Sequence, residues 1–382
     1  FKQTQSLRLP SSIVLQSGKQ ARQQCCAHRR QIDRHRILER HCRRAWIEQV
    51  LQRGINKTVS HRFEVTHVCK QLAQTPLRGL LKRYMAKEYA RENMRGIWAA
   101  ALNPFNADLS MNETGLRANI RHWIDDLDIQ GLFIAGKQGE FWSMSLAERM
   151  RNMSIAAEEC GESAGTIMSI SDQNVDTVLD LGRHAQSCGA DYVVVHAPML
   201  SFCHDRDEVL YNYYKYICDR LDIGIAMWSH PDSGYLMEPD TCARIAELPN
   251  IVAIKYSVPR DMYVRLSHMI GDMIHVSTSL EDDWLDNIEE LGWKLYLCSS
   301  PPYQLQTKND RRMHDYTQLA FQGKFAEARK IRDSLDPVRR AFRDSKPAGK
   351  PQAHGKYWQE LLGQVGGPVR HPMLNLTETE KA

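Results

Sequence analysis

From Gly96 onward the chain repeats one pattern eight times: a short apolar run of strand length, then a longer stretch with helical periodicity. The runs start roughly 20 to 35 residues apart, a spacing that suits strand–helix units pairing in parallel. Eight such units close a sheet into a barrel. We therefore predict an α/β fold, a (β/α)8 barrel over residues 95–310, with strands at 97–102, 131–135, 166–170, 192–196, 223–228, 251–255, 274–277 and 294–298.

Helix signals support this assignment. Ser145 and Glu148 form a capping-box pattern, and Pro239 occupies a position where a first-turn proline is tolerated. After the eighth strand, amphipathic stretches near 311–321, 324–343 and 353–363 exceed what a barrel needs. They predict a C-terminal helical appendage over residues 311–382.

The first 84 residues differ from the rest in charge. They hold 18 basic and 4 acidic residues, a net +14, whereas the remainder has 32 basic and 42 acidic residues, a net −10. Without sustained apolar periodicity, residues 1–84 are interpreted as a disordered or non-native extension. Translated upstream sequence, an organelle transit segment and a basic nucleic-acid-binding arm all fit this composition.

The cysteine and hydropathy patterns indicate the cellular compartment of the protein. The ten cysteines form no CxxC pair, and no apolar run has the length of a membrane span. We expect a reducing compartment, the cytoplasm, and no membrane partner. A zinc site is not expected, because the spacing in the cluster Cys25, Cys26, His28, His41 and Cys42 fits no established pattern.

The active site of such a barrel is built at the carboxyl ends of its strands. Those positions supply Asn103, Gly136, Lys137, Gln138, Gly139, Glu140, Ser171, Asp172, His196, Trp228, Ser229, His230, Lys255, Tyr256, Ser277, Thr278, Ser279, Ser299 and Ser300.

Lys255 ends the apolar run of the sixth strand, so its amine should rise into the barrel mouth. Desolvation favours a neutral amine there, and a neutral amine can attack the carbonyl of an oxo acid to form an imine. The alternative is a lysine that extends outward into solvent.

The loop after the second strand contains Gly136, Lys137, Gln138 and Gly139 before a capped helix. Its backbone N–H groups can bind an anion such as a carboxylate, and Lys137 adds a positive charge. Close packing between helix and strand would require the same two glycines.

These residues resemble the dihydrodipicolinate synthase and N-acetylneuraminate lyase superfamily of class I, Schiff-base aldolases over roughly residues 95–375. The resemblance rests on Asn-Pro-Phe at 103–105, the loop at 136–140, Ala-Pro at 197–198, Ile-Val-Ala-Ile-Lys at 251–255 and Gly-Gly-Pro-Val-Arg at 366–370. It implies that Lys255 is the Schiff-base lysine, that the substrates are a 2-oxo acid and an aldehyde, that no cofactor is needed, and that the protein is a homotetramer. Shorter matches at 198–199, 255–256, 281–283 and 299–300 are similar to the hydratase-aldolase branch acting on benzylidenepyruvates.

The sequence departs from the family where protons are moved. Trp228 replaces a tyrosine, Lys137 and Gln138 replace paired hydroxyl residues, and Leu200 replaces a second tyrosine; Ser233 stands where an arginine is often found. An indole N–H donates a hydrogen bond but does not shuttle protons at neutral pH. His196 and His230 are therefore the candidate acid–base groups, whereas strand alternation turns Tyr256 away from the interior.

Three other functions fit parts of the sequence. A metal-dependent hydrolase could use His196, His230 and Asp172, but its usual histidine pair is missing from the first strand. A non-catalytic barrel could bind a small oxo acid after losing the proton relay. A nucleic-acid function would rest only on residues 1–84. The sequence favours a lyase or aldolase in which Lys255 reacts with pyruvate or a related 2-oxo acid.

Overall fold

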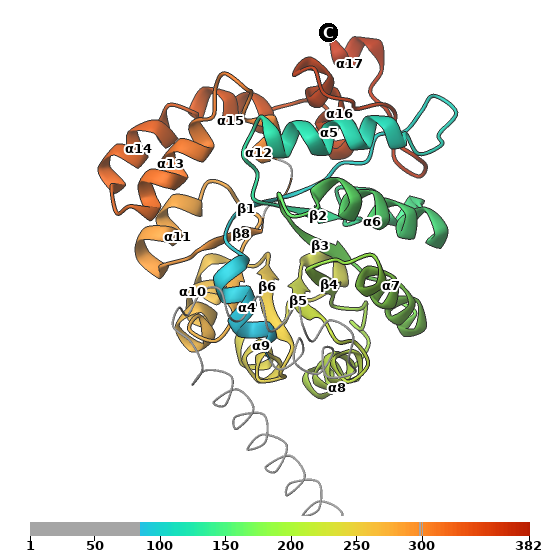
Figure 1. The fold of residues 1–382 in the computed structure, drawn as a ribbon, viewed down its shortest axis with the longest axis vertical. Helices are drawn as coiled ribbons and strands as arrows, with labels where there is room; N and C mark the ends of the chain where they lie inside the picture. The colour runs from blue at the N-terminus through green and yellow to red at the C-terminus, as the bar shows by residue number, and fades with distance from the viewer. Residues whose placement is uncertain (1–84, 298, 300) are drawn as a thin grey trace, which may run out of the picture. The chain divides into compact units, whose positions relative to one another are not determined.

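A computed structural model describes residues 85–382 except 298 and 300 (Figure 1). The predictions for residues 1–84, including the cysteine and histidine cluster, lie outside the described residues.

Eight parallel strands form the centre of the fold (Figure 1). Their order is β7-β6-β5-β4-β3-β2-β1-β8. The two end strands, β7 and β8, lie close together, as the hydrogen bond from the Leu297 N–H to Ser277 Oγ (2.7 Å) shows. The strands are β1 (Gly96–Ala100), β2 (Gly131–Ile134), β3 (Gly165–Ser169), β4 (Tyr192–His196), β5 (Gly224–Ser229), β6 (Ile251–Tyr256), β7 (His275–Ser277) and β8 (Leu295–Leu297). The prediction of a (β/α)8 barrel is confirmed.

Each predicted apolar run coincides with one strand, and the bounds differ by at most two residues. The run at 131–135 ends one residue early because Ala135 adopts a left-handed backbone, φ 54°, which leaves the strand conformation. The chain therefore turns into the site loop one residue earlier than apolar character alone suggests.

Helices surround the strands (Figure 1). Ser145 and Glu148 make both bonds of the predicted capping box, and Pro239 begins its helix. The helices of the barrel units are α5 (Glu113–Asp125), α6 (Leu146–Cys160), α7 (Val175–Ser187), α8 (Arg206–Cys218), α9 (Pro239–Ala246), α10 (Arg260–Ile270), α11 (Trp284–Leu291) and α12 (Pro301–Gln304), with 3-10 turns η1 (Phe141–Ser143) and η2 (Pro231–Ser233).

The C-terminal part is helical: α13 (Arg312–Phe321), α14 (Phe325–Asp333), α15 (Asp336–Arg343), α16 (Pro351–Leu361) and α17 (Glu378–Lys381). The single stretch expected at 324–343 is two helices. Pro337, in the first turn of α15, has no N–H to continue the hydrogen bonds of α14, so a new helix starts there.

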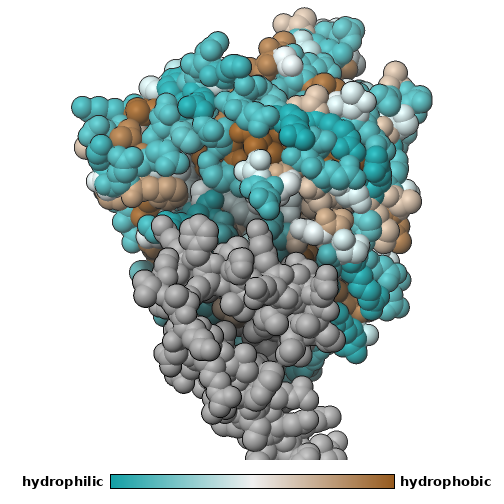
Figure 2. Space-filling view, in the orientation of Figure 1, coloured by the Kyte–Doolittle hydropathy of each residue, from teal (hydrophilic) through white to brown (hydrophobic). Residues whose placement is uncertain are grey.

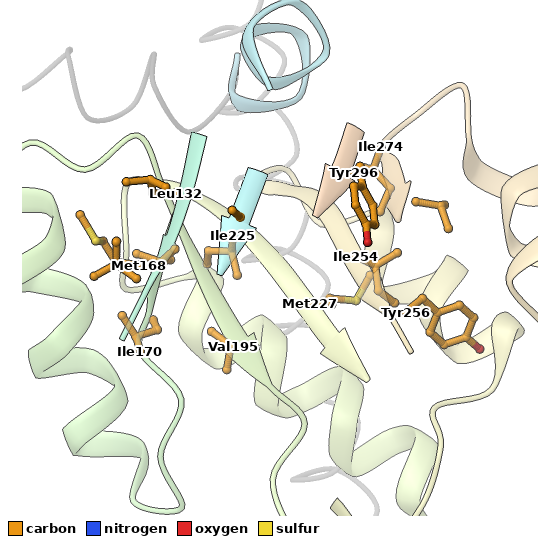
Figure 3. Packing of buried hydrophobic residues seen from close by; sticks show 14 of the residues in the cluster. Leu132, Met168, Ile170, Val195, Ile225, Met227, Ile254, Tyr256, Ile274 and Tyr296 are labelled. Carbon is orange, nitrogen blue, oxygen red and sulfur yellow. The ribbon is translucent and has the colours of Figure 1, made fainter. Parts of the chain in front are cut away.

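The buried side chains form two layers, inside and outside the strands. The outer layer packs strands against helices and includes Met168, Val195, Ile254 and Tyr256 (Figure 3). The Tyr256 hydroxyl donates to Met237 O (2.6 Å), so this phenol faces away from the interior, as predicted.

The inner layer fills the barrel. It includes Trp98, Phe133 and Trp228, and helix α4 (Ala86–Asn93) contributes Ala86 and Ala90 to the same cluster. Filling by side chains makes the interior a packed core, so ligands must approach from the strand ends.

The visible surface of the described residues is mostly hydrophilic, with scattered hydrophobic side chains (Figure 2). Among the described residues, no helix is long and apolar enough to cross a bilayer.

Candidate active site

Four inward residues lie at one level across neighbouring strands. His196 of β4 is the register partner of Trp228 of β5, Trp228 that of Lys255 of β6, and Lys255 that of Ser277 of β7. Partners in a parallel ladder project from the same face, so the four side chains share the carboxyl end of the barrel. Local strand propensity placed each residue, and pairing of the strands brought them together.

A cavity of about 80 Å³ opens at this level. Lys255 is only 4% exposed, and its Nζ lies 4.7 Å from the ring centroid of Phe133 and 5.3 Å from that of Trp228. The alternative of an outward, solvated lysine does not fit this burial. The lining residues are Ala100, Phe133, Lys137, Gln138, Trp228, His230, Lys255, Ser257, Ser279 and Ser299.

The loop after β2 supplies Lys137 and Gln138 to the cavity. Its glycines serve packing: a Cβ on Gly136 would lie 2.7 Å from the Phe133 ring, and one on Gly139 would lie 3.0 Å from Asn103 Nδ2. Neither glycine is among the lining residues. These contacts support close packing, the second of the two interpretations that the sequence allows, for both glycines.

Lys137, a lining residue of the cavity, forms an ion pair with Asp232. Burial by itself would raise the pKa of Asp232, but the hydrogen bond from Lys137 and the nearby His230 bring it below its ordinary value. Sequence reasoning missed Asp232. The available signal was its position two residues after His230 in the loop that follows β5.

The two candidate histidines differ in placement. His196 Nδ1 donates to Ala197 O (2.7 Å), which leaves Nε2 as an acceptor, and the ring packs edge-on against Trp228 at 4.7 Å. His230 lines the cavity, whereas His196 is not among the lining residues.

Both imidazoles are neutral at pH 7. Burial lowers the pKa of His196. Burial and the charge of Lys137 lower the pKa of His230 to about 4. His230 Nδ1 lies 3.2 Å from the Asp232 backbone nitrogen and 3.2 Å from Asp232 Oδ1, so this ring nitrogen has a partner in either tautomer.

Trp228 is 3% exposed, and its Nε1 has no hydrogen-bond partner among the described residues. A buried donor in a cavity wall is costly unless a ligand or water satisfies it. Leu200 packs against the outer core instead and does not line the cavity.

Three hydroxyl side chains also line the cavity. Ser257, Ser279 and Ser299 face the cavity, and the Oγ atoms of Ser257 and Ser279 are 3.3 Å apart. Sequence reasoning did not single out Ser257, although alternation from Lys255 places it on the same side.

Other strand-end residues support the scaffold. Asn103 Nδ2 donates to Gly139 O (2.7 Å), and Arg149 pairs with Asp172 (3.1 Å). Among residues 85–382 that the structure describes, no group of three or more His, Cys, Asp or Glu side chains could hold a metal ion.

The fold and the site define a barrel enzyme whose cavity is built around a buried lysine amine. The model of the dihydrodipicolinate synthetase family matches residues 93–382. The chain belongs to this family and is a lyase of the class I aldolase type.

Individual relatives are distant. The chain is 25% identical to the 4-hydroxy-tetrahydrodipicolinate synthase of Methanothrix thermoacetophila over 75% of its length and 94% of the relative. It is also 25% identical to a "Probable 5-dehydro-4-deoxyglucarate dehydratase" of Bradyrhizobium sp., covering 79% and 94%. YagE of E. coli K12, a member of the dihydrodipicolinic acid synthase family solved in complex with pyruvate, is similar in fold, with a TM-score of 0.67, 20% identity, and coverage of 75% of this chain and 95% of YagE.

Proposed function

We propose that the protein is a Schiff-base lyase in which Lys255 condenses with pyruvate or a related 2-oxo acid. One observation carries this proposal: the amine of Lys255 lies buried at the end of β6, in a cavity, against two aromatic rings. Family membership supports the same role for this lysine.

The amine nitrogen adds to the 2-oxo carbon, and loss of water leaves a protonated imine. Cleavage of the bond between the third and fourth carbons sends its electron pair into the imine and forms an enamine. In a 4-hydroxy-2-oxo acid, a base removes the proton of the hydroxyl on the fourth carbon, and this carbon leaves as an aldehyde. Protonation of the enamine and hydrolysis then release the shortened oxo acid and restore Lys255; condensation is the reverse sequence.

Lys137 and Gln138 are proposed to bind the oxo-acid carboxylate, because both line the cavity and Lys137 carries a positive charge. The Trp228 N–H, which lacks a partner among the described residues, would donate to a second acceptor on the substrate. These groups fix one end of the substrate.

The remainder of the substrate is proposed to extend toward Ser257, Ser279 and Ser299. Their hydroxyls suit a hydroxylated chain, whereas Phe133 and Trp228 suit an aromatic acceptor of the benzylidenepyruvate type. The names of the two relatives refer to different substrates. The aldehyde partner should therefore be sought by assaying a panel of hydroxylated and aromatic aldehydes.

We assign proton transfer to His230. It lines the cavity and is neutral, and its Nδ1 lies beside Asp232. A neutral imidazole accepts a proton at its unprotonated ring nitrogen, and the imidazolium that forms can return it in the reverse step. His196, outside the cavity lining, is assigned to support of the Trp228 ring.

A homotetramer in the cytoplasm is proposed as the working form. Met199 and Phe202, in the loop after β4, are 54% and 76% exposed, which suits an interface between copies. Light scattering during gel filtration would measure the assembly, and a monomeric mass would contradict it.

The central experiment is reductive trapping. The protein is incubated with pyruvate and borohydride and then digested, and the masses of its lysine-containing peptides are measured by mass spectrometry. The expected result is one pyruvate-derived adduct on Lys255, with the peptide containing Lys137 as the internal control. No adduct, or an adduct confined to Lys137, would overturn the proposal.

A further inference from the structure

Two loops that line the cavity each carry one buried carboxylate beside a lining residue. Glu140 follows Gln138 by two positions and is 0% exposed; Glu281 follows Ser279 by two positions and is 6% exposed. Each carboxylate is held by a cation from a C-terminal helix: Lys356 of α16 pairs with Glu140, and Arg339 of α15 pairs with Glu281.

Glu140 is paired with Lys356 of α16. Its Oε1 lies 2.6 Å from Lys356 Nζ, and Lys356 is 1% exposed. Glu140 Oε2 accepts the Arg370 N–H (2.9 Å), and Lys356 also donates to Pro368 O (2.8 Å). The C-terminal segment therefore encloses this carboxylate from two sides.

Arg370 extends the same connection toward α6. Its guanidinium binds Glu148 through two nitrogens (3.0 and 2.7 Å) and donates to Ser143 O (3.2 Å). The segment from Gly136 to Glu148 is thus held at several points by one stretch near the end of the chain.

Glu281 is paired with Arg339 of α15. The two carboxylate oxygens accept from Arg339 Nε (2.5 Å) and one terminal nitrogen (2.7 Å), and Tyr316 of α13 donates its hydroxyl to the same carboxylate (2.5 Å). This bidentate geometry fixes orientation as well as distance.

Buried ion pairs are poor sources of stability. Removing two charges from water costs free energy that their attraction often fails to offset, so a well-packed apolar pair of the same size would serve as well or better. A carboxylate with polar partners on both oxygens is held in one position and orientation, which an apolar contact does not achieve. Because both pairs lie two residues from a lining residue, they can fix the positions of Gln138 and Ser279.

Backbone strain supports this interpretation at Glu140. Its φ is 57°, a left-handed conformation that costs a residue with a side chain about 1 kcal/mol or more. Glycine would adopt it freely, but glycine has no carboxylate to bind Lys356. The strained backbone persists because the side chain is held.

We propose that Glu140–Lys356 and Glu281–Arg339 are positioning pairs, through which the C-terminal helices set Gln138 and Ser279 against the substrate bound at Lys255. This inference rests on the proposed Schiff-base function. It adds a role for the C-terminal helices in the reaction, although none of these four residues contacts the substrate.

The first test replaces each pair by neutral side chains of similar size: Glu140→Gln with Lys356→Met, and Glu281→Gln with Arg339→Met. Removing both charges avoids an uncompensated buried ion, so Tm should stay within a few degrees of wild type. We expect kcat/KM for the oxo acid to fall at least tenfold. Lys350→Met is the matched control, because Lys350 pairs with Glu380 (2.6 Å) in the same helical region but touches neither loop.

The dependence of kcat/KM on pH gives a further test, because a purely structural role of Lys356 would not change it. Burial lowers the pKa of Lys356 to about 8. Its positive charge is therefore lost above that pH, and kcat/KM should fall there. Because the folded pKa lies below that of the unfolded chain, this group makes folding more favourable as the pH rises, so activity and stability should diverge.

The outcomes separate the two proposals. If pyruvate and borohydride do not label Lys255 in the wild type, the proposed function fails. If the wild type is labelled and both double variants keep kcat/KM within twofold, or if loss of activity follows loss of Tm in every variant, the positioning role fails. Should a double variant be too unstable, Arg339→Lys, which keeps the charge without the bidentate contact, gives the same comparison.

Discussion

Trp228 and Lys255 are register partners across β5 and β6, and the Lys255 amine lies 5.3 Å from the centroid of the indole ring. An indole N–H donates a hydrogen bond but does not exchange its proton at neutral pH. Its N–H is buried without a partner among the described residues. Trp228 is therefore suited to bind substrate beside the amine, and proton transfer must come from another side chain.

Substitution of Trp228 by phenylalanine should separate binding from stability. Loss of the N–H removes a substrate hydrogen bond, so KM for the oxo acid should rise about fivefold to tenfold, or about 1 kcal/mol. Tm should fall less than for Trp228→Ala, which also opens a cavity. Steady-state kinetics and thermal melting test this, and an unchanged KM in Trp228→Phe would exclude the hydrogen bond.

His230→Asn should slow turnover by about a hundredfold or more, the usual contribution of a positioned acid–base group. Labelling of Lys255 by pyruvate and borohydride should persist, because imine formation does not require the lost imidazole when the substrate is small. His196→Asn should have a smaller effect on kcat. Equal losses in the two variants would contradict the assignment to His230.

The same histidine makes stability depend on pH. Burial and the Lys137 charge lower its pKa from 6.5 to about 4, so the unfolded chain binds a proton that the folded protein does not between these values. Stability should therefore decline as the pH falls from 6.5 to 4. Urea titrations should show a shallower decline for His230→Asn.

Gly136→Ala should distort a wall of the cavity. The added Cβ would lie 2.7 Å from the ring of Phe133, which faces the Lys255 amine. We expect a loss of about 1–3 kcal/mol in unfolding free energy, together with a higher KM. Gly349→Ala is the control, because nothing lies within 4 Å of the position that its new methyl group would take. Equal stability of the two variants would show that the ring moves without cost.

Lys137→Met should raise KM for the oxo acid at least tenfold while changing Tm little. Its pair with Asp232 is partly exposed, and such pairs contribute about 0–1 kcal/mol to stability. Lys215→Met removes a comparable exposed pair with Asp219 on α8, away from the cavity. An unchanged KM in Lys137→Met would show that Lys137 does not bind the substrate carboxylate.

Much of this architecture could be predicted because its signals are local. Apolar runs marked all eight strands, and the capping box at Ser145 and the proline at 239 marked two helix starts. The same periodicity placed Lys255 at the end of β6 and turned Tyr256 outward. It did not separate α14 from α15, because apolar residues recur at helical spacing across the break between Asp333 and Asp336.

The partners of the site residues were not predictable. Asp232 lies 95 residues from Lys137, and Lys356 lies 216 residues from Glu140, yet each pair is in direct contact. Local sequence patterns do not predict such pairs, since each charged side chain would also be stable if it were exposed to water. Gly136 and Gly139 likewise suited two roles until the neighbours of each were placed.

By itself, the sequence determined which segments become strands, which residues end them, and that a lysine closes the sixth; these follow from side-chain periodicity and backbone preference within a few residues. Only the tertiary structure decided that Lys255 is buried against two rings, that Asp232 holds Lys137, and that the C-terminal helices hold the loops carrying Glu140 and Glu281. Burial and ion pairing depend on groups far apart in the chain, and closure of the barrel is what brings them together.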